Sequence, residues 1–332
     1  EAAHYAAVTA ANAEALLERT RPGDVVVLHD PQTAGLARII VDAGVHAVWR
    51  CHIGADRTNE HTDSAWAALR PHLEHAEAVI FSRRQYIPAW VPPEAAVVIP
   101  PSIDPFSPKN QHLSPAEVHS LVAEADPSLA GLDAPLVVQV SRWDRLKDMA
   151  GVMAGFVSGV APVTDAHLAL VGPDVSEVPD DPEGAAVLAE CSAAWAELPS
   201  AVRDRVHVVT VPMDDVRRNA LMVNALQRSA TVIVQKSLAE GFGLTVAEGM
   251  WKRRPVVGSA VGGIVDQLVP GTGILLDDPA DLDTFGRTLA GQLGQPAEIE
   301  RLGHNAEAHV RDCFVGDRHL LRYAGLFARL CA

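Results

Sequence analysis

The chain alternates short, continuously apolar runs with longer segments in which apolar residues recur every three or four positions. The short runs predict buried parallel strands, and the longer segments predict amphipathic helices. Strands are expected at residues 24–29, 47–51, 78–82, 136–140, 167–171, 206–211, 230–234 and 255–258. Helices are expected at residues 2–19, 33–43, 64–75, 115–125, 149–158, 183–198, 216–228, 244–251, 282–293 and 297–312, with a short helix ending at residue 268. This alternation predicts an α/β protein.

A proline-rich segment, residues 88–108, interrupts the alternation. Such a segment between two α/β regions is typical of a connection between domains. We therefore expect an N-terminal domain at residues 1–106 and a C-terminal domain at residues 107–312, for which 332 residues suffice. Because the chain opens on a helix rather than a strand, we expect an upstream portion of the first domain to be absent from it.

Charge and composition exclude several classes of partner. The net charge of −15 disfavours nucleic acid and anionic membrane surfaces, which require clustered Lys and Arg. The longest apolar run, residues 151–163, is shorter than the roughly 20 residues that span a bilayer. The four cysteines lack the paired spacing of a zinc site, and we expect no secretory leader. These features predict a soluble cytoplasmic protein with reduced thiols.

The most informative stretch is QKSLAEGFGLTVAEGMW, residues 235–251, which follows an apolar strand. Gly241 and Gly243 permit a sharp turn and a close approach of the backbone to a ligand, and a helix starts at Leu244. The amides and the positive dipole end of a helix start favour a phosphate. Glu240 and Glu248 bracket this site and can accept hydrogen bonds from hydroxyls of a sugar and of a ribose. The stretch predicts a sugar-nucleotide site.

A second cluster, SRWDRLKD, residues 141–148, leaves the strand at residues 136–140. Loops at the carboxyl ends of parallel strands are where ligands bind. Arg142 offers a bidentate fork and Lys147 a compact charge, so the two could neutralise a diphosphate leaving group without a metal ion.

Other nucleotide and metal motifs are disfavoured. The single Asp-x-Asp, residues 281–283, lies at a loop-to-helix junction, where acidic residues mostly cap helices. Gly241-x-Gly243 lacks the third glycine of a dinucleotide fingerprint, and no phosphate-binding loop of the Gly-Lys-Ser/Thr type occurs. We expect no metal site and no cofactor.

The order of Arg142, Lys147, Glu240 and Glu248 resembles that of the retaining glycosyltransferases of family 4. The resemblance implies the GT-B architecture: two Rossmann-like α/β/α domains with parallel sheets facing across a cleft, and a final segment, residues 313–332, that returns to the first domain. The words LHDPQT, WRCHI, IPPSIDPFSPKN and SRWDRLKD together look like the trehalose synthases of this family, which join glucose from a nucleotide donor to free glucose. A homodimer is plausible for the resembling enzymes.

The resemblance also implies roles for individual residues. His52 would contact the transferred glucose, and Asp30 and Gln32 would hold the acceptor. Glu240 would hold hydroxyls of the donor sugar and act with His52, Arg142 and Lys147 as the catalytic set, whereas Glu248 would hold the ribose. The remaining donor-binding residues are the four whose amides would surround the distal phosphate and sugar and two that would pack against the base: Gly241, Phe242, Gly243, Leu244, Val211 and Pro212.

Two departures concern the acceptor side. Gly54 stands where an acidic residue is expected, and Ser82-Arg83-Arg84-Gln85 replaces a more neutral segment. Two alternatives to trehalose formation therefore stay open. One is the same donor chemistry on a sugar phosphate or cyclitol, and the other is a sugar-nucleotide binder without activity. The donor base is not indicated.

Overall fold

The chain divides into two compact units in the computed structural model, which describes residues 1–177 and 182–332. The first unit comprises Glu1–Pro101 and Asp317–Ala332, and the second comprises Ser102–Gly316. We expected the boundaries after residues 106 and 312. They differ because the backbone N–H of Ile103 donates to the carbonyl of Phe314 (2.8 Å), which holds both connecting segments in the second unit.

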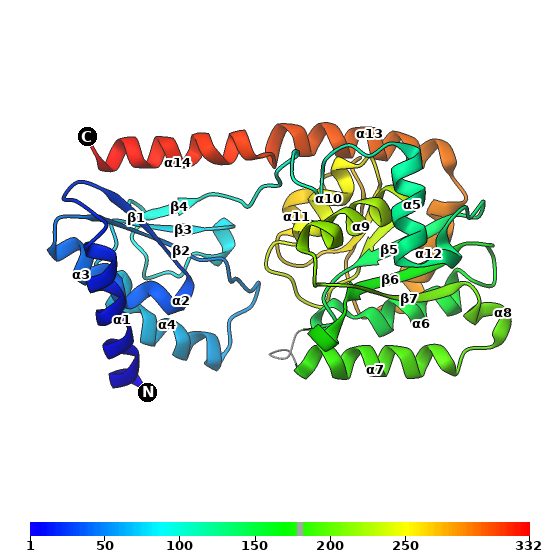
Figure 1. Ribbon diagram of the computed structural model, residues 1–332, viewed down its shortest axis with the longest axis horizontal. Helices are drawn as coiled ribbons and strands as arrows, with labels where there is room; N and C mark the ends of the chain where they lie inside the picture. Colours follow the sequence, from blue (N-terminus) through cyan, green and yellow to red (C-terminus); the bar gives the residue numbers. More distant parts are fainter. Residues whose placement is uncertain (178–181) are drawn as a thin grey trace. The chain divides into compact units, whose positions relative to one another are not determined.

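The first unit contains a four-stranded parallel sheet in the order β1-β2-β3-β4 (Figure 1). Its strands are β1 (Val25–His29), β2 (His46–Arg50), β3 (Ala78–Phe81) and β4 (Ala96–Val98). Its helices are α1 (Ala2–Leu17), α2 (Asp30–Thr33), α3 (Ala37–Asp42), α4 (Glu60–Leu73) and α14 (Gly316–Leu330), with 3₁₀ turns η1 (Ala34–Leu36) and η2 (Arg84–Tyr86). Leu326 of α14 packs with Val48 and Ile80 on one face of the sheet, and α1, α3 and α4 contribute to the core on the other face.

The sequence analysis missed β4 because prolines surround it. Pro92 and Pro93 precede the strand and Pro100 follows it. A short strand at the edge of a sheet tolerates neighbouring prolines, since only one side of its backbone pairs with another strand. The helix predicted at residues 64–75 starts earlier, at Glu60, because Asn59 and Thr62 form a capping box. The Asn59 side chain accepts from the Thr62 amide, and the Thr62 hydroxyl accepts from the Asn59 amide.

The second unit contains a six-stranded parallel sheet in the order β10-β9-β8-β5-β6-β7. Its strands are β5 (Leu136–Val140), β6 (His167–Pro173), β7 (Val206–Val211), β8 (Val232–Gln235), β9 (Val256–Ser259) and β10 (Ile274–Leu276). Its helices are α5 (Pro115–Ala125), α6 (Met149–Gly159), α7 (Pro182–Ala196), α8 (Ser200–Arg203), α9 (Val216–Ser229), α10 (Leu244–Trp251), α11 (Ile264–Gln267), α12 (Leu282–Leu293) and α13 (Pro296–Cys313), and the 3₁₀ turns are η3 (Pro127–Leu129), η4 (Arg145–Lys147) and η5 (Val175–Glu177). The predicted α/β class with parallel sheets is confirmed.

Helices cover both faces of this second sheet (Figure 1). One apolar core includes Val138, Leu226 and Val246, contributed by β5, α9 and α10. The other includes Phe156 and Phe285, contributed by α6 and α12. The two cores fix the sheet between helix layers, so that the loops at its edges are held on a rigid frame.

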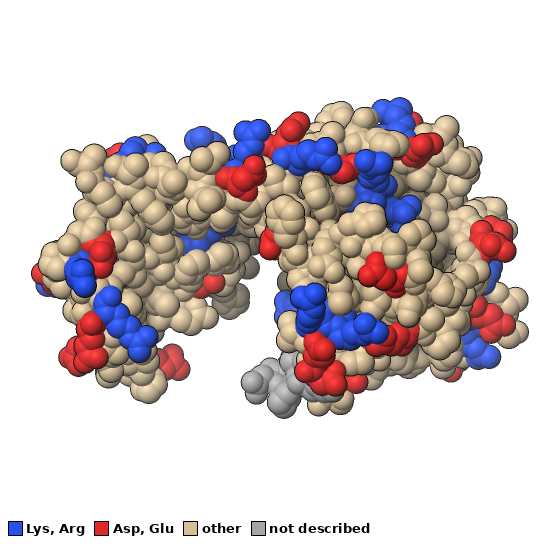
Figure 2. All heavy atoms as spheres, turned by 45° about the horizontal axis from the view of Figure 1, so that its top comes forward, with Lys and Arg blue, Asp and Glu red and all other residues tan. Residues whose placement is uncertain are grey.

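The surface carries charges of both signs. On the face drawn in Figure 2, acidic and basic side chains are interspersed. Among the described residues, no helix is long and apolar enough to cross a membrane.

Candidate active site

The order of the second sheet reverses between β5 and β8, its two central strands. At such a point the loops that follow the two strands diverge and leave a ligand site at the carboxyl edge of the sheet. The loop after β5 carries Arg142 and Lys147, and the loop after β8 carries Glu240. The Leu238 amide donates to the Leu146 carbonyl (2.8 Å), which ties the two loops together.

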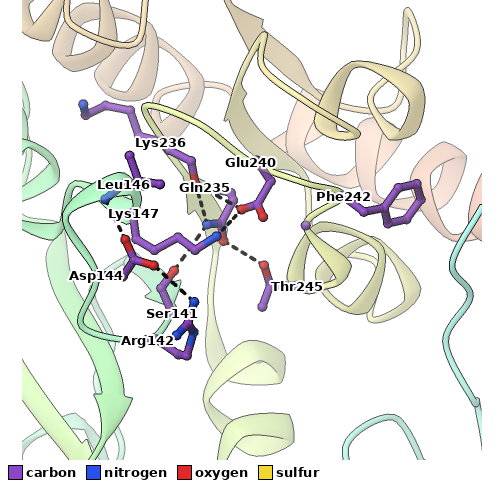
Figure 3. Close-up of polar contacts among 12 residues, drawn as sticks. Ser141, Arg142, Asp144, Leu146, Lys147, Gln235, Lys236, Glu240, Phe242 and Thr245 are labelled. Carbon is purple, nitrogen blue, oxygen red and sulfur yellow. Dashed lines mark hydrogen bonds and ion pairs between the residues drawn. The ribbon is translucent and has the colours of Figure 1, made fainter. Parts of the chain in front are cut away.

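Lys147 and Glu240 point toward one another from these two loops (Figure 3). The Lys147 ammonium donates to Glu240 Oε2 at 2.6 Å, and the two side chains are only 17% and 10% exposed. Ser237 Oγ donates to the same carboxylate oxygen (3.3 Å). An ion pair largely shielded from water is stronger and better fixed than a surface pair, so a cation and a hydroxyl acceptor are held side by side at this edge.

Arg142 lies on the same loop and remains accessible. Its side chain is 68% exposed, and Nη2 donates to Asp144 Oδ2 at 3.2 Å. Asp144 also accepts from the Leu146 amide (2.8 Å) and so caps the turn that carries Lys147. A guanidinium has five N–H donors, so this single bond orients Arg142 and leaves donors for an anion.

The turn between β8 and α10 has the conformation expected of a close backbone approach. Gly243 caps α10 in the left-handed region (φ 79°, ψ 61°), and an added Cβ there would lie 3.1 Å from Glu240 Cγ. The Gly263 amide donates to the Gly241 carbonyl (3.0 Å), and Gln267 Nε2 donates to the Phe242 carbonyl (2.6 Å). These bonds fix the carbonyls of the turn from the side of α11.

The side chains of two predicted donor-binding residues, Phe242 and Val211, face the core. For Phe242 only the backbone amide was expected to bind. Phe242 is 7% exposed and contacts the Phe314 ring (centroids 5.8 Å apart), and Figure 3 shows it pointing away from Lys147 and Glu240. Val211, at the end of β7, is buried in the core that includes Val138. Pro212 follows it and accepts a hydrogen bond from Asn219 through its carbonyl (2.8 Å). Phe242 and Val211 can therefore contact a ligand only through their backbone atoms.

Glu248 and Leu244 lie on α10 itself. Leu244 is partly exposed at the helix start, whereas Glu248 is 5% exposed. Lys109 Nζ lies 3.6 Å from Glu248 Oε1, and Oε2 is buried without a partner among the described residues. A buried carboxylate oxygen that lacks a donor is suited to receive a hydroxyl. The sequence analysis gave no role to Lys109, which directly follows the proline-rich segment and is far from α10 in the sequence.

A polar network behind the ion pair was also missed. Gln235, the buried last residue of β8, donates through Nε2 to Ser237 Oγ (3.0 Å) and Ser141 Oγ (3.3 Å). It accepts from Thr245 Oγ1 (2.8 Å), so it joins both loops to α10. A polar residue at the end of an apolar strand was the available signal, because a buried amide requires partners.

In the first unit, one histidine ends β1 and another follows the neighbouring parallel strand β2. His29 Nδ1 lies 2.8 Å from His52 Nε2, and the rings stack with their centroids 5.1 Å apart. The His52 amide donates to Asp30 Oδ1 (2.8 Å), and Asp30 has a left-handed backbone (φ 62°) fixed by Trp49, whose Nε1 donates to its carbonyl. Gln32 is exposed on α2. The structure therefore brings together His29, Asp30 and His52 at the carboxyl edge of this sheet.

The environment of His52 favours the neutral imidazole. Burial lowers its pKa, and the positive charge of Arg50 lowers it further, against an opposing contribution from Asp30. Arg50 is itself buried at the end of β2, where it donates to the Ile99 carbonyl (2.5 Å) and to Ser82 Oγ (3.2 Å). A neutral His52 can accept a hydrogen bond from a sugar hydroxyl at neutral pH.

Comparison with known proteins decides the family. Residues 1–88 match the family model described as trehalose synthase, N-terminal domain, and residues 134–292 match the model described as glycosyl transferases group 1. Over 321 residues the chain is 35% identical to the trehalose synthase of Rubrobacter xylanophilus. The aligned region covers 96% of this chain and 72% of that protein. The chain belongs to the trehalose synthase family. It is a glycosyltransferase.

Solved structures agree on the fold of this trehalose synthase family member. An α,α-trehalose-phosphate synthase from Burkholderia vietnamiensis superposes with a TM-score of 0.74 at 17% identity, covering 99% of this chain and 80% of that one. The Anabaena protein HepE, solved in complex with UDP-glucose, superposes with a TM-score of 0.68 at 17% identity, covering 92% and 79%. These likenesses identify the GT-B glycosyltransferase fold.

The two departures from the expected trehalose synthase pattern lie together. An added Cβ at Gly54 would meet the Tyr86 ring at 2.0 Å, so an acidic side chain does not fit there unless Tyr86 moves. Arg83 lies over the same ring at 5.2 Å and donates to Asp56 Oδ1 at 2.7 Å. An acidic side chain is thus present two positions after Gly54, at Asp56, and the buried Arg83 binds its carboxylate.

Proposed function

We propose that this protein is a retaining glucosyltransferase that moves glucose from a nucleoside diphosphate glucose to free glucose and so forms trehalose. The observation that carries the proposal is the largely buried pair of Lys147 and Glu240 at the switch point of the second sheet. The pair places a cation that can bind phosphate beside a carboxylate that can accept from sugar hydroxyls. The start of α10, which favours phosphate, follows Glu240 in the chain.

In the proposed reaction the bond between C1 of the donor glucose and the distal phosphate oxygen breaks. Negative charge then grows on the leaving diphosphate, where Arg142, Lys147 and the amides at the start of α10 stabilise it. Fixed cations can supply this stabilisation, so we propose that no metal ion is required.

The incoming hydroxyl forms the new bond to C1 on the face that the phosphate leaves. Its proton passes to the departing phosphate oxygen, which gives retention of configuration without a protein nucleophile. Glu240 holds hydroxyls of the transferred glucose, and Glu248 holds the ribose. His52, as the neutral imidazole, contacts the transferred glucose. Asp30 and Gln32 are proposed to hold the acceptor.

The charge of Arg83 gives no support to a phosphorylated acceptor. Arg83 is 4% exposed and paired with Asp56, so its charge is already compensated. A sugar phosphate acceptor requires an uncompensated cation to bind its dianion. Free glucose requires only hydrogen-bonding groups.

An acceptor panel tests this proposal. The protein would be incubated with ADP-, UDP- or GDP-glucose together with glucose, glucose 6-phosphate or inositol, and the products separated by chromatography. We expect a disaccharide with glucose alone, equally in the presence of a chelator. Turnover only with a phosphorylated acceptor or cyclitol would replace the acceptor assignment, and nucleotide binding with no product from any pair would indicate a binding protein.

A further inference from the structure

A cavity lies in the second unit, at the opposite edge of its six-stranded sheet from Lys147 and Glu240. It holds about 400 Å³ between α5 and α9, and its lining includes Leu136, the first residue of β5, and Ser229, which precedes β8. The proposed donor site instead follows the carboxyl ends of β5 and β8. The cavity is therefore separate from that site, and its volume lies in the range of small-molecule pockets, roughly 300–1,000 Å³.

Apolar side chains form one part of the wall of this cavity. Val118 and Val122 line it from α5, and Leu113, Leu129 and Leu136 line it from the neighbouring segments. Four of these five side chains are at most 5% exposed in the folded chain. Such walls favour a hydrocarbon or aromatic body.

Two arginines, Arg228 and Arg254, line the same cavity. Neither forms an ion pair with a carboxylate in the part of the chain that the structure describes. Burial lowers the pKa of both guanidinium groups, and the charge of Arg228 adds to the effect on Arg254. Two neighbouring positive charges without a counter-charge repel one another, which is notable in a chain with a net charge of −15.

The hydrogen bonds of the two arginines leave capacity for a ligand. Arg228 donates to Asn224 Oδ1 (2.9 Å) and to the Gln111 carbonyl (2.9 Å), and so also supports the chain near Asn110. Arg254 donates through Nη2 to the Arg228 carbonyl (2.5 Å). Its Nε is buried without a partner among the described residues. Because this Nε has no accessible surface, a ligand in the cavity would meet the Nη atoms instead. Nη1 of each guanidinium donates to no acceptor in the part of the chain that the structure describes.

We propose that this cavity is a second binding site, which takes a small phosphate monoester with an apolar body. A phosphate dianion balances two guanidinium charges, and its oxygens accept the forked bonds that arginine offers. The apolar part of the ligand lies against the leucine and valine side chains. The site is independent of the proposed sugar donor, whose phosphates bind at the other edge of the sheet.

Calorimetric titration with phenyl phosphate tests the proposal on wild type, Arg254→Gln and Ala130→Leu. Ala130 lines the cavity, so leucine there fills space and leaves both guanidinium groups in place. We expect saturable binding to wild type that is at least about tenfold weaker in each variant. Inorganic phosphate, which lacks the apolar body, should bind at least about tenfold more weakly than phenyl phosphate.

Lys147→Ala is the control for phenyl phosphate binding at the donor loops, and it should leave the affinity unchanged. The proposal is overturned if wild type shows no saturable binding at millimolar concentrations. It is also overturned if either cavity variant keeps the wild-type affinity, or if Lys147→Ala abolishes binding. Equal affinities for phenyl phosphate and inorganic phosphate would remove the apolar body from the proposal.

Discussion

Lys147 and Glu240, which are 93 positions apart in the chain, are joined by a 2.6 Å bond between the ammonium and a carboxylate oxygen. Each comes from a loop that follows one of the two central strands, so the pair spans the switch point of the second sheet. Because both side chains are largely buried, each fixes the position of the other.

Removing a cation from this loop should slow the chemical step. Lys147→Ala and Arg142→Ala are each expected to lower kcat by about 30- to 1,000-fold, or roughly 2–4 kcal/mol, because the lost charge acts on the leaving diphosphate. Steady-state kinetics with saturating donor measures this. Arg145→Ala is the matched control, since Arg145 lies on the same turn but pairs with Glu190 at the surface. Wild-type turnover in Lys147→Ala would contradict the role.

Glu248 should report on the ribose of the donor. Glu248→Ala is expected to weaken binding of the nucleoside diphosphate by about 10- to 100-fold, because its unpartnered oxygen would accept from a ribose hydroxyl. The 2′-deoxy and 3′-deoxy nucleotides provide the matching ligand changes. If Glu248 holds the ribose, one of these nucleotides binds the variant no more weakly than the parent nucleotide does. If the losses in binding free energy from Glu248→Ala and from each deoxy nucleotide simply add, Glu248 does not contact the ribose.

Asp30 should affect the acceptor and not the donor. Asp30→Asn keeps an oxygen for the His52 amide and tolerates the left-handed backbone, so the fold is retained. The lost charge is expected to raise KM for glucose about tenfold and to leave KM for the donor unchanged. A change in the donor KM alone would show that Asp30 binds the donor and not the acceptor.

Lys252 links stability to pH in the second unit. Burial lowers the pKa of its ammonium to about 7, although Glu248 opposes the shift, and its Nζ donates to Asn110 Oδ1 (3.0 Å) and to the Glu248 carbonyl (3.1 Å). Between about pH 7 and 10.5 the unfolded chain binds the proton that the folded chain has released. The Lys252 contribution to the free energy of unfolding therefore rises with pH in this window, by at most ~1.4 kcal/mol per pH unit.

Denaturant unfolding of wild type and Lys252→Met across this pH range tests the effect. The difference between the two free energies of unfolding should change with pH, in favour of wild type as the pH rises. A pH-independent difference would show that the folded and unfolded pKa values of Lys252 are alike.

Much of this organisation could be predicted because local patterns determine it. The apolar run before Gln235 and the helix from Leu244 are strong local signals, and they put the turn with Gly243 in the correct place. The contact between Lys147 and Glu240 depends on the strand order, which periodicity does not encode. Side-chain direction was the other gap: Val211 was expected to pack against the base, but its side chain is buried in the core.

The most direct test of the account is the anomeric structure of the product. The full-length protein would be given glucose nucleotide labelled with ¹³C at C1 of the sugar, together with unlabelled glucose, and the product examined by NMR. We predict a non-reducing disaccharide whose labelled carbon has the α configuration, linked to the α-anomeric carbon of the second glucose. A reducing disaccharide, a β-configured labelled carbon, or transfer of the label to water alone would contradict the proposed function.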